Sequence, residues 1–278
     1  MDLLWGVTGV RRYGFSVEVI ATGDEIMFGR IVDTNSGWIA RRASELGAGL
    51  RRVTCVGDDV NEIGDALGGA LSRGSDMVIF TGGLGPSEDD LTVEAIGRAL
   101  GRRVVLDPVA VEKIRRIYAE RGVSDTARGQ RMARVLEGST AIPNPVGMST
   151  GMVLREGGTT IVTFPGIPAE MQAMFEEHVA PVIEGRSGSR HAARTVTARV
   201  VFKDFFPVYH QMQRDYPDVY LKNAATPPES PEERSRVKDI KVDVVVEGAT
   251  AVECEAGLEA VLAEFGRRLG EVGGKLLT

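Results

Sequence analysis

Short apolar runs alternate with segments of helical periodicity along the first two thirds of the chain. The apolar runs have the length of buried strands and lie at residues 17–22, 50–56 and 77–80. The segments with apolar residues at helical spacing lie at residues 34–46, 60–73, 91–100 and 107–121. Strands that alternate with helices form a parallel sheet covered on both faces. The pattern predicts an α/β fold, a three-layer α/β/α sandwich with a mainly parallel sheet, over residues 16–188.

The pattern after residue 103 mixes both kinds of element. It predicts a short edge strand at 104–105 and, after the helix that begins at Asp107-Pro108, a second, polar helix at about 125–134. Prolines and glycines predict a loop at 141–151. A hairpin should follow, with strands at 152–155 and 160–164. We expect the last helix of this region to begin at Glu170 and to end near residue 183.

The last ninety residues show a different order of elements. Gly185 to Ser189 has the composition of a linker. Beyond it we predict a small α+β domain, residues 189–278, with strands at 195–202, 219–222 and 237–246 and helices at 206–216 and 250–269. In the longest strand one face should be buried, comprising Val237, Ile240, Val242, Val244 and Val246. Residues 1–15 are expected to form a lead-in before the first domain.

Composition narrows the class of protein. The chain has 278 residues, is 43% hydrophobic and 26% charged, and carries a formal net charge of −6. The charge gives no support to a nucleic-acid partner. No apolar run reaches transmembrane length, and the N-terminal charges do not fit a secretory signal, so we expect no membrane partner and a cytoplasmic location. Cys55 and Cys254 are expected to be buried thiols, and the histidines show no zinc-ligand spacing.

The stretch from Thr81 to Asp90, TGGLGPSEDD, lies between a predicted buried strand and a predicted helix. Ligands of open α/β sheets bind at such junctions. Gly82, Gly83 and Gly85 carry no side chain, so backbone N–H groups can approach an anion closely. The start of the helix adds free donors. We therefore predict a phosphate site here, with Thr81 and Ser87 beside the glycines.

Acidic residues crowd the same stretch. Glu88, Asp89 and Asp90 would repel a bare phosphate, and Asp58 lies at the end of another predicted strand. Mg²⁺ resolves the conflict, since it binds through one or two carboxylates together with substrate phosphates. Other interpretations remain open: Ser87 and Asp90 also fit a capping box, and Asp58 also fits a helix N-cap.

TGGLGPSEDD resembles the TGGLGPTxDD signature of CinA-like proteins (competence/damage-inducible protein A), which share the MoaB/Mog-type molybdopterin-binding domain. Ser87 in place of Thr is the one departure. Two further segments resemble family elements, Thr22 to Asn35 and Phe164 to Met171. The resemblance implies a ligand pocket whose further residues are Thr22, Gly23, Glu25, Asn35, Asn144, Gly147, Pro165, Gly166 and Glu170.

The resemblance also implies a function. It favours the binding of a phosphate-bearing pterin or nucleotide and a metal-dependent pyrophosphatase of the ADP-ribose type. Catalysis and metal binding would fall to Asp58, Asp89 and Asp90, with a divalent metal, Mg²⁺, as cofactor. The alternatives are a non-catalytic binding module or a molybdopterin adenylyltransferase-like enzyme of molybdenum cofactor biosynthesis. Family members are dimers or trimers, so we expect a homo-oligomer. The further amidohydrolase domain of many CinA-like chains is not expected in these residues.

Overall fold

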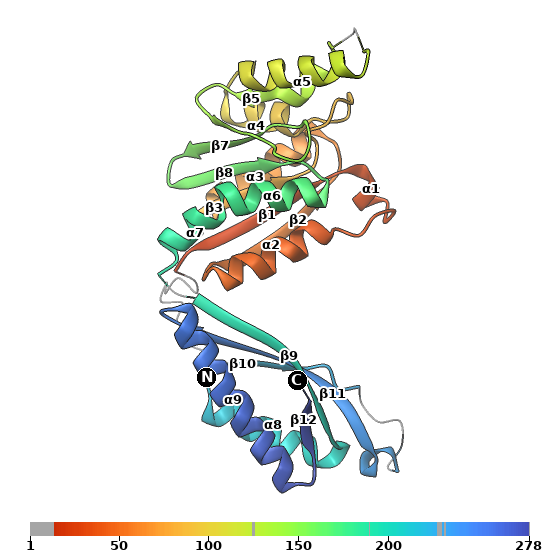
Figure 1. Cartoon of the computed structure of the whole chain (residues 1–278), viewed down its shortest axis with the longest axis vertical. Coiled ribbons are helices and arrows are strands. Elements are labelled where there is room, and N and C mark those ends of the chain that lie inside the picture. The colour runs from red at the N-terminus through yellow and green to blue at the C-terminus, as the bar shows by residue number, and fades with distance from the viewer. Residues whose placement is uncertain (1–13, 124–125, 189, 227–229, 231, 278) are drawn as a thin grey trace, which may run out of the picture. The chain divides into compact units, whose positions relative to one another are not determined.

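The computed structural model describes residues 14–277 except 124–125, 189, 227–229 and 231. The chain divides into two compact units, with the main boundary between Ser187 and Gly188 and with residues 45–47 grouped with the second unit (Figure 1). The expected lead-in lies outside the described residues up to residue 13, whereas Phe15 is buried in the first unit. No helix in the described part of the chain combines the length and the apolar character needed to cross a bilayer.

The first unit is built on a six-stranded sheet of order β2-β1-β3-β8-β7-β6. Its strands are β1 (Ser16–Thr22), β2 (Gly49–Val56), β3 (Met77–Thr81), β6 (Thr140–Ile142), β7 (Gly151–Glu156) and β8 (Thr159–Phe164). The pairs β1–β2, β1–β3 and β3–β8 are parallel, and the hairpin β7–β8 and the pair β6–β7 are antiparallel. The prediction of a mainly parallel sheet is confirmed.

Helices cover both faces of this sheet (Figure 1). The helices of this unit are α1 (Asp24–Met27), α2 (Thr34–Glu45), α3 (Val60–Ser72), α4 (Thr92–Leu100), α5 (Pro108–Glu120), α6 (Pro168–His178) and α7 (Ala180–Arg186). On one face α3 and α4 pack against Ile20, Val78 and Phe80. On the other, α2 meets α6, where the rings of Trp38 and Phe175 are 5.2 Å apart edge to face. Every residue of β1 is buried because both faces are covered.

The segment between α5 and β6 differs from its prediction. The predicted polar helix at 125–134 is wrong: its described part contains one 3₁₀ helix, η1 (Gly129–Ala133). Met132 and Ala133 are buried in a small cluster with Ile114 of α5. The segment therefore packs against that helix as a short 3₁₀ turn. The predicted edge strand is β4 (Val104–Leu106), and it pairs with β5 (Arg134–Leu136) in a two-stranded sheet outside the main sheet. The predicted loop at 141–151 begins as strand β6.

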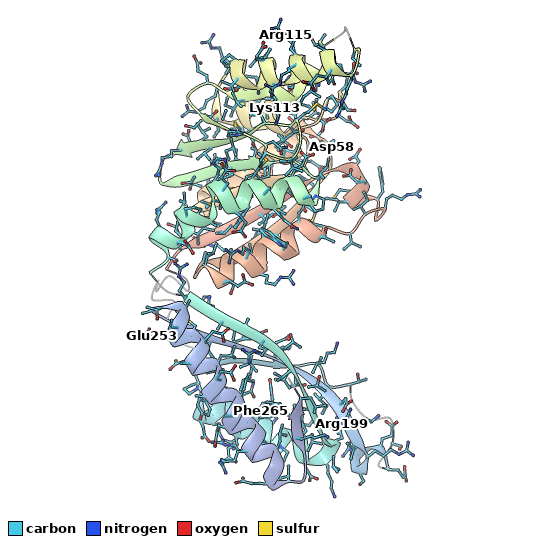
Figure 2. The ribbon with its side chains drawn as sticks, in the orientation of Figure 1. Asp58, Lys113, Arg115, Arg199, Glu253 and Phe265 are labelled. Carbon is cyan, nitrogen blue, oxygen red and sulfur yellow. The ribbon has the colours of Figure 1, made fainter. Side chains whose placement is uncertain are left out.

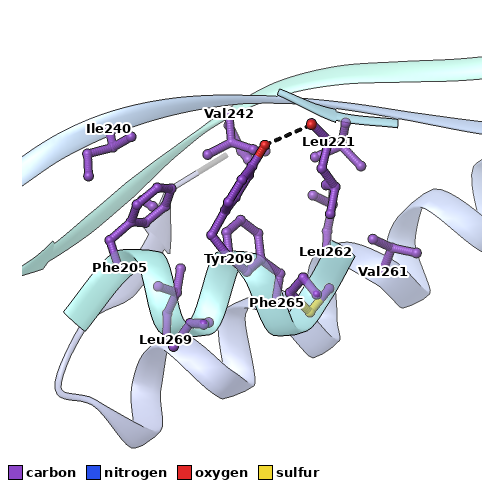
Figure 3. Close-up of a cluster of buried hydrophobic side chains, with 14 of the residues drawn as sticks. Phe205, Tyr209, Leu221, Ile240, Val242, Val261, Leu262, Phe265 and Leu269 are labelled. Carbon is purple, nitrogen blue, oxygen red and sulfur yellow. Dashed lines mark hydrogen bonds between the residues drawn. The ribbon is translucent and has the colours of Figure 1, made fainter. Parts of the chain in front are cut away.

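The second unit is a four-stranded antiparallel sheet of order β10-β11-β9-β12. Its elements are β9 (Arg190–Val201), α8 (Phe202–Asp215), β10 (Tyr220–Asn223), η2 (Glu233–Ser235), β11 (Val237–Gly248), α9 (Ala251–Glu271) and β12 (Lys275–Leu277). Figure 3 shows side chains of α8 and α9 packed beneath the sheet, with the hydroxyl of Tyr209 donating to the carbonyl of Leu221 at 2.8 Å. The unit therefore has its own core.

Two burial predictions are wrong at sheet positions. Val237 is 61% exposed, although Ile240, Val242 and Val244 are buried as predicted. Side chains alternate between the two faces of this regular strand, and Val237 is three residues before Ile240, so it lies on the opposite, exposed face. Cys55 is exposed because β2 is an edge strand and the middle of it faces solvent. Cys254 is buried, and both cysteines are free thiols.

Candidate functional site

A cleft of about 650 Å³ opens at the carboxyl ends of β1, β3 and β8. This is the end of a parallel sheet at which α/β proteins bind ligands. The lining comes from loops that are far apart in the sequence and consists of Thr22, Gly23, Glu25, Ile26, residues 31–35, Asp58, residues 81–87, Asp89, Asp90, Met132, Met148, Ser149, residues 165–168 and Glu170. The cleft is thus assembled by the strand order.

The glycine loop after β3 needs its glycines. Gly82 and Gly83 have φ values of 104° and 65°, in the region that L side chains avoid. A Cβ at Gly82 would collide with the carbonyl oxygen of Thr22, and one at Gly83 would collide with the hydroxyl oxygen of Thr92. Thr92 donates to the carbonyl of Gly82 at 3.0 Å, and its hydroxyl lies 3.0 Å from that of Thr22. The two threonines therefore fix the loop against the end of β1.

Asp90 closes this loop. Its Oδ2 accepts a hydrogen bond from the backbone N–H of Ser87 at 2.8 Å, and a Cβ on Gly85 would lie 2.6 Å from that oxygen. The capping-box interpretation of Ser87 and Asp90 is wrong, since α4 begins only at Thr92 and Leu91, its N-cap, makes no side-chain bond. The guanidinium of Arg131 donates to the Asp90 carbonyl at 3.2 Å. The loop is therefore held by its own carboxylate.

Asp58 lies beside Asp24 at the acidic side of the cleft. Each carboxylate accepts from the backbone N–H of the other residue, both at 3.1 Å. Burial raises the pKa of Asp58, and the charges of Asp24, Glu25 and Asp89 raise it further, against the hydrogen bond from the Asp24 N–H. The N-cap interpretation of Asp58 is wrong, because Asp59 caps α3. Asp58 is consequently a carboxylate that the fold places among other acids.

The opposite side of the cleft is formed by Asn35 and Glu170. Asn35 Nδ2 donates to the carbonyl of Gly166 at 2.9 Å, which ties the start of α2 to the loop before α6. Glu170 is only 9% exposed, and its Oε2 accepts from Asn144 Nδ2 at 2.6 Å. Asn144 Oδ1 in turn accepts from the backbone N–H of Gly147 at 2.8 Å. Asn35 is thus held by the loop before α6, and Glu170 by the loop that contains Asn144.

The structure brings nearly all predicted site residues to one place. Those that line the cleft are Thr22, Gly23, Glu25, Asn35, Asp58, Thr81, Gly82, Gly83, Gly85, Ser87, Asp89, Asp90, Pro165, Gly166 and Glu170. Asn144 and Gly147 do not line it but stand behind Glu170. Sequence reasoning missed Asp24, Thr92 and Lys113. Thr92 is the first residue of α4, and only its position shortly after the glycine loop could have indicated its role in the site.

The charged side chains that line the cleft are all acidic. Six carboxylates face the cleft, those of Glu25, Asp33, Asp58, Asp89, Asp90 and Glu170, and the described lining contains no Lys, Arg or His. Within the part of the chain that the structure describes, no three His, Cys, Asp or Glu side chains are grouped closely enough to hold a metal ion by themselves. The cleft therefore offers scattered carboxylates rather than a ready-made metal centre.

The fold and the cleft are those of a molybdopterin-binding domain. A sequence profile described as "Probable molybdopterin binding domain" matches residues 18–185. A protein of Pyrobaculum calidifontis is 35% identical over 256 residues, which is 89% of this chain and 93% of that protein. A CinA-like protein of Dictyoglomus thermophilum is 33% identical over 254 residues, 91% of this chain but 59% of that protein.

A solved structure agrees with this assignment. The protein CinA of Thermoplasma acidophilum, described as having unknown function, superposes with a TM-score of 0.56 at 36% identity over 60% of this chain and 97% of that one. The chain therefore belongs to the molybdopterin-binding-domain family, with CinA-like proteins among its relatives.

Proposed function

We propose that the cleft binds a phosphate-bearing pterin or nucleotide together with a divalent cation, Mg²⁺, and hydrolyses a diphosphate bond of the ADP-ribose type. One observation carries the proposal. Backbone donors of the glycine loop meet six carboxylates in a cleft whose described lining has no basic side chain. Phosphate groups in such surroundings need a cation to offset the repulsion between negative charges.

The donor set fits Mg²⁺ in part. All its candidate ligands are oxygens, as a hard cation requires. Within the described residues no three His, Cys, Asp or Glu side chains are close enough to hold the ion alone, so phosphate oxygens of the ligand would complete its coordination. Asp58 and Asp89 would hold the ion, since both line the cleft. Asp90 has one oxygen committed to Ser87 and would contribute the other. When bound, the ion would supply Lewis-acid activation of a phosphoryl group or of water.

The chain's own residues would do the rest of the work. The N–H groups from Gly83 to Gly85 would stabilise charge on phosphate oxygens, because the loop fixes them before the ligand arrives, whereas the N–H of Gly82 donates to the carbonyl of Phe164 at 3.0 Å. The loop from Pro165 to Pro168 forms a stiff opposite wall, since proline fixes φ. The ionised carboxylate of Asp58, which lines the cleft, would accept the proton of the attacking water.

A second candidate is pterin binding without hydrolysis, or adenylyl transfer to a molybdopterin. The family description favours it, because it names molybdopterin as the ligand. Both candidates use the same donors and acids and differ in turnover. They are therefore distinguished by activity and not by binding.

The test is a thermal-shift screen followed by an assay for hydrolysis. ADP-ribose, ATP and a pterin phosphate are each added with Mg²⁺ or with EDTA. We expect a rise in the unfolding midpoint that needs Mg²⁺, and release of AMP from ADP-ribose. Metal-dependent binding without release of any product would favour the second candidate. Equal stabilisation with EDTA would contradict the shared-cation proposal.

The proposal includes a homo-oligomer, a dimer or trimer, in the cytoplasm, with no nucleic-acid or membrane partner. Exposed large apolar side chains support subunit contact: Val32, which lines the cleft, is 80% exposed, and Phe28 of the same loop region is 74% exposed. Two free thiols support a reducing compartment. Light scattering of the intact chain tests the oligomer, and a monomeric mass would contradict it.

A further inference from the structure

Lys113 reaches from α5 to the loop behind the cleft. Its Nζ donates to the carbonyl oxygens of Asn144 and Gly147 at 2.5 Å and 2.6 Å. Burial lowers the pKa of this lysine, against the charge of Glu170, which raises it. A partly buried ammonium bound to two carbonyls fixes the loop on both sides of the turn at Asn144 to Gly147.

The loop that Lys113 holds in turn holds Glu170. Asn144 Nδ2 donates to Glu170 Oε2, and a side chain on Gly147 would collide with the Glu170 carboxylate. Asn144 Nδ2 also donates to the carbonyl of Ser149 at 3.1 Å, and Ser149 lines the cleft. The carboxylate is therefore oriented from behind by an amide, with a lysine charge close by to offset its burial.

A second acceptor lies in the same wall. Asn35 is only 7% exposed and lines the cleft, and its Oδ1 is buried with no hydrogen-bond partner in the described structure. A buried acceptor without a partner costs free energy that a donor would restore. The wall with Asn35 and Glu170 thus presents acceptors, whereas the glycine loop presents backbone donors.

We propose that Asn35 and Glu170 form an acceptor subsite for N–H or O–H groups at the end of the ligand that carries no phosphate, and that Lys113 is a positioning residue for Glu170. The inference rests on the proposed function and names the ligand chemistry of the same cleft. Amino and ring N–H groups of a pterin and hydroxyl groups of a ribose both offer such donors. A ligand made of phosphate alone offers none.

The experiment compares three probes by calorimetry, each with Mg²⁺: inorganic pyrophosphate, the α,β-methylene analogue of ADP-ribose, which the proposed hydrolysis does not cleave, and 6-hydroxymethylpterin diphosphate. The variants are Glu170→Gln, Lys113→Met and Lys113→Arg, with Arg115→Met as the control. Figure 2 shows Lys113 and Arg115 on different sides of α5, and Arg115 pairs with the exposed Glu112 of the same helix. The organic probe that binds better in the wild type identifies pterin or ribose as the source of the donors.

We expect Glu170→Gln to weaken binding of the organic probe about 10- to 100-fold, which is what a hydrogen bond to a charged group contributes. Pyrophosphate binding should change less than about twofold. Lys113→Met should weaken the organic probe in the same selective way by about 5- to 10-fold, Lys113→Arg should restore part of the loss, and Arg115→Met should change nothing.

Contrary outcomes separate the two proposals. If the wild type binds none of the probes, the proposed function fails and the inference fails with it. If the wild type binds but the Glu170 and Lys113 variants keep their affinity for the organic probe, or lose pyrophosphate to the same extent, the acceptor subsite is wrong and the proposed function stands. A lower unfolding midpoint of Lys113→Met with unchanged affinity would give Lys113 a merely structural role.

Discussion

Asp24 and Asp58 exchange hydrogen bonds, each carboxylate accepting the backbone N–H of the other residue at 3.1 Å. This exchange joins the turn after β1 to the turn after β2. It also places two carboxylates side by side, and the pKa of Asp58 is raised by burial and by its acidic neighbours. The arrangement fits a site that binds a cation, because a positive charge would offset the repulsion between these carboxylates.

Replacing Asp58 with asparagine should separate function from stability. The new side chain keeps an acceptor for the Asp24 N–H but carries no charge, so metal-dependent hydrolysis should fall about 100-fold or more. An acid whose pKa is raised by folding lowers the free energy of unfolding as the pH rises above about 3.9, its usual value, through its folded pKa. In EDTA, Asp58→Asn should therefore unfold at a higher temperature than the wild type at pH 7.5.

The stabilisation should disappear below about pH 4, where both forms of residue 58 are neutral. Calorimetric unfolding at both pH values measures it. Asp65→Asn on α3 is the control, since Asp65 is exposed and does not line the cleft. A variant that hydrolyses ADP-ribose as fast as the wild type would remove Asp58 from the mechanism.

Gly83→Ala should disrupt the phosphate loop, and Gly29→Ala provides a matched control. Both glycines have φ 65°, so an alanine costs about 1–2 kcal/mol at either position. A Cβ at Gly29 meets nothing within 4 Å, whereas one at Gly83 collides with the Thr92 hydroxyl. Chemical denaturation should show a loss of about 3 kcal/mol or more for Gly83→Ala, with loss of pyrophosphate binding.

The control variant Gly29→Ala should lose about 1 kcal/mol and keep pyrophosphate binding. If both variants lose the same free energy of unfolding, the loop must shift to relieve the collision with Thr92. Its glycines would then be required only for their positive φ angles.

Arg73→Met should lower the free energy of unfolding, because it removes the ion-pair partner of a buried carboxylate. Glu18 is 1% exposed, and Arg73 donates to it at 2.6 Å. Burial would raise the pKa of Glu18, but hydrogen bonds from Arg73 and Ser75 lower it overall. Removing the arginine leaves the charge unpaired and should cost about 3 kcal/mol at pH 7.

The pH dependence of this cost follows from its sign. A lowered pKa contributes stability above the usual glutamate value, about 4.3, and that stability is lost as the pH falls through the folded pKa. The deficit of Arg73→Met should therefore shrink in acid, as measured by urea denaturation between pH 3 and 7. Arg103→Met, which breaks an exposed pair with Glu137, should cost less than about 1 kcal/mol. A deficit that does not depend on pH would show that packing alone explains it.

Tyr209→Phe should weaken the second unit without touching the cleft. The Tyr209 hydroxyl bonds to the Leu221 carbonyl inside the core, so its loss leaves that carbonyl unpaired at about 1–2 kcal/mol (Figure 3). Hydrogen exchange of the intact chain should become faster in α8 and β10. Tyr220→Phe, at a side chain 58% exposed, should change exchange little. Unchanged protection in Tyr209→Phe would indicate that water replaces the lost donor.

Much of the secondary structure of the first unit could be predicted from the sequence, because the patterns that indicate it are local. The helix over α2 followed from Ile39, Ala43 and Leu46, all buried as predicted, and its start followed from Asp33, which accepts from the Ser36 N–H at 3.0 Å. These signals depend on spacing within one element. The polar helix at 125–134 failed because a weak local pattern was overruled by the burial of Met132 and Ala133 against α5.

The sequence by itself determined most of the strands and helices and the place of the glycine loop, since backbone conformation and apolar periodicity act over a few residues. It did not reveal the short strands β5, β6 and β12. Only the tertiary structure decided that Lys113 reaches carbonyls 31 and 34 residues away, that Asp24 meets Asp58, and that Cys55 faces solvent on an edge strand. Such contacts depend on the order of strands in the sheet, and a linear pattern of polar and apolar residues does not encode which loops that order brings together.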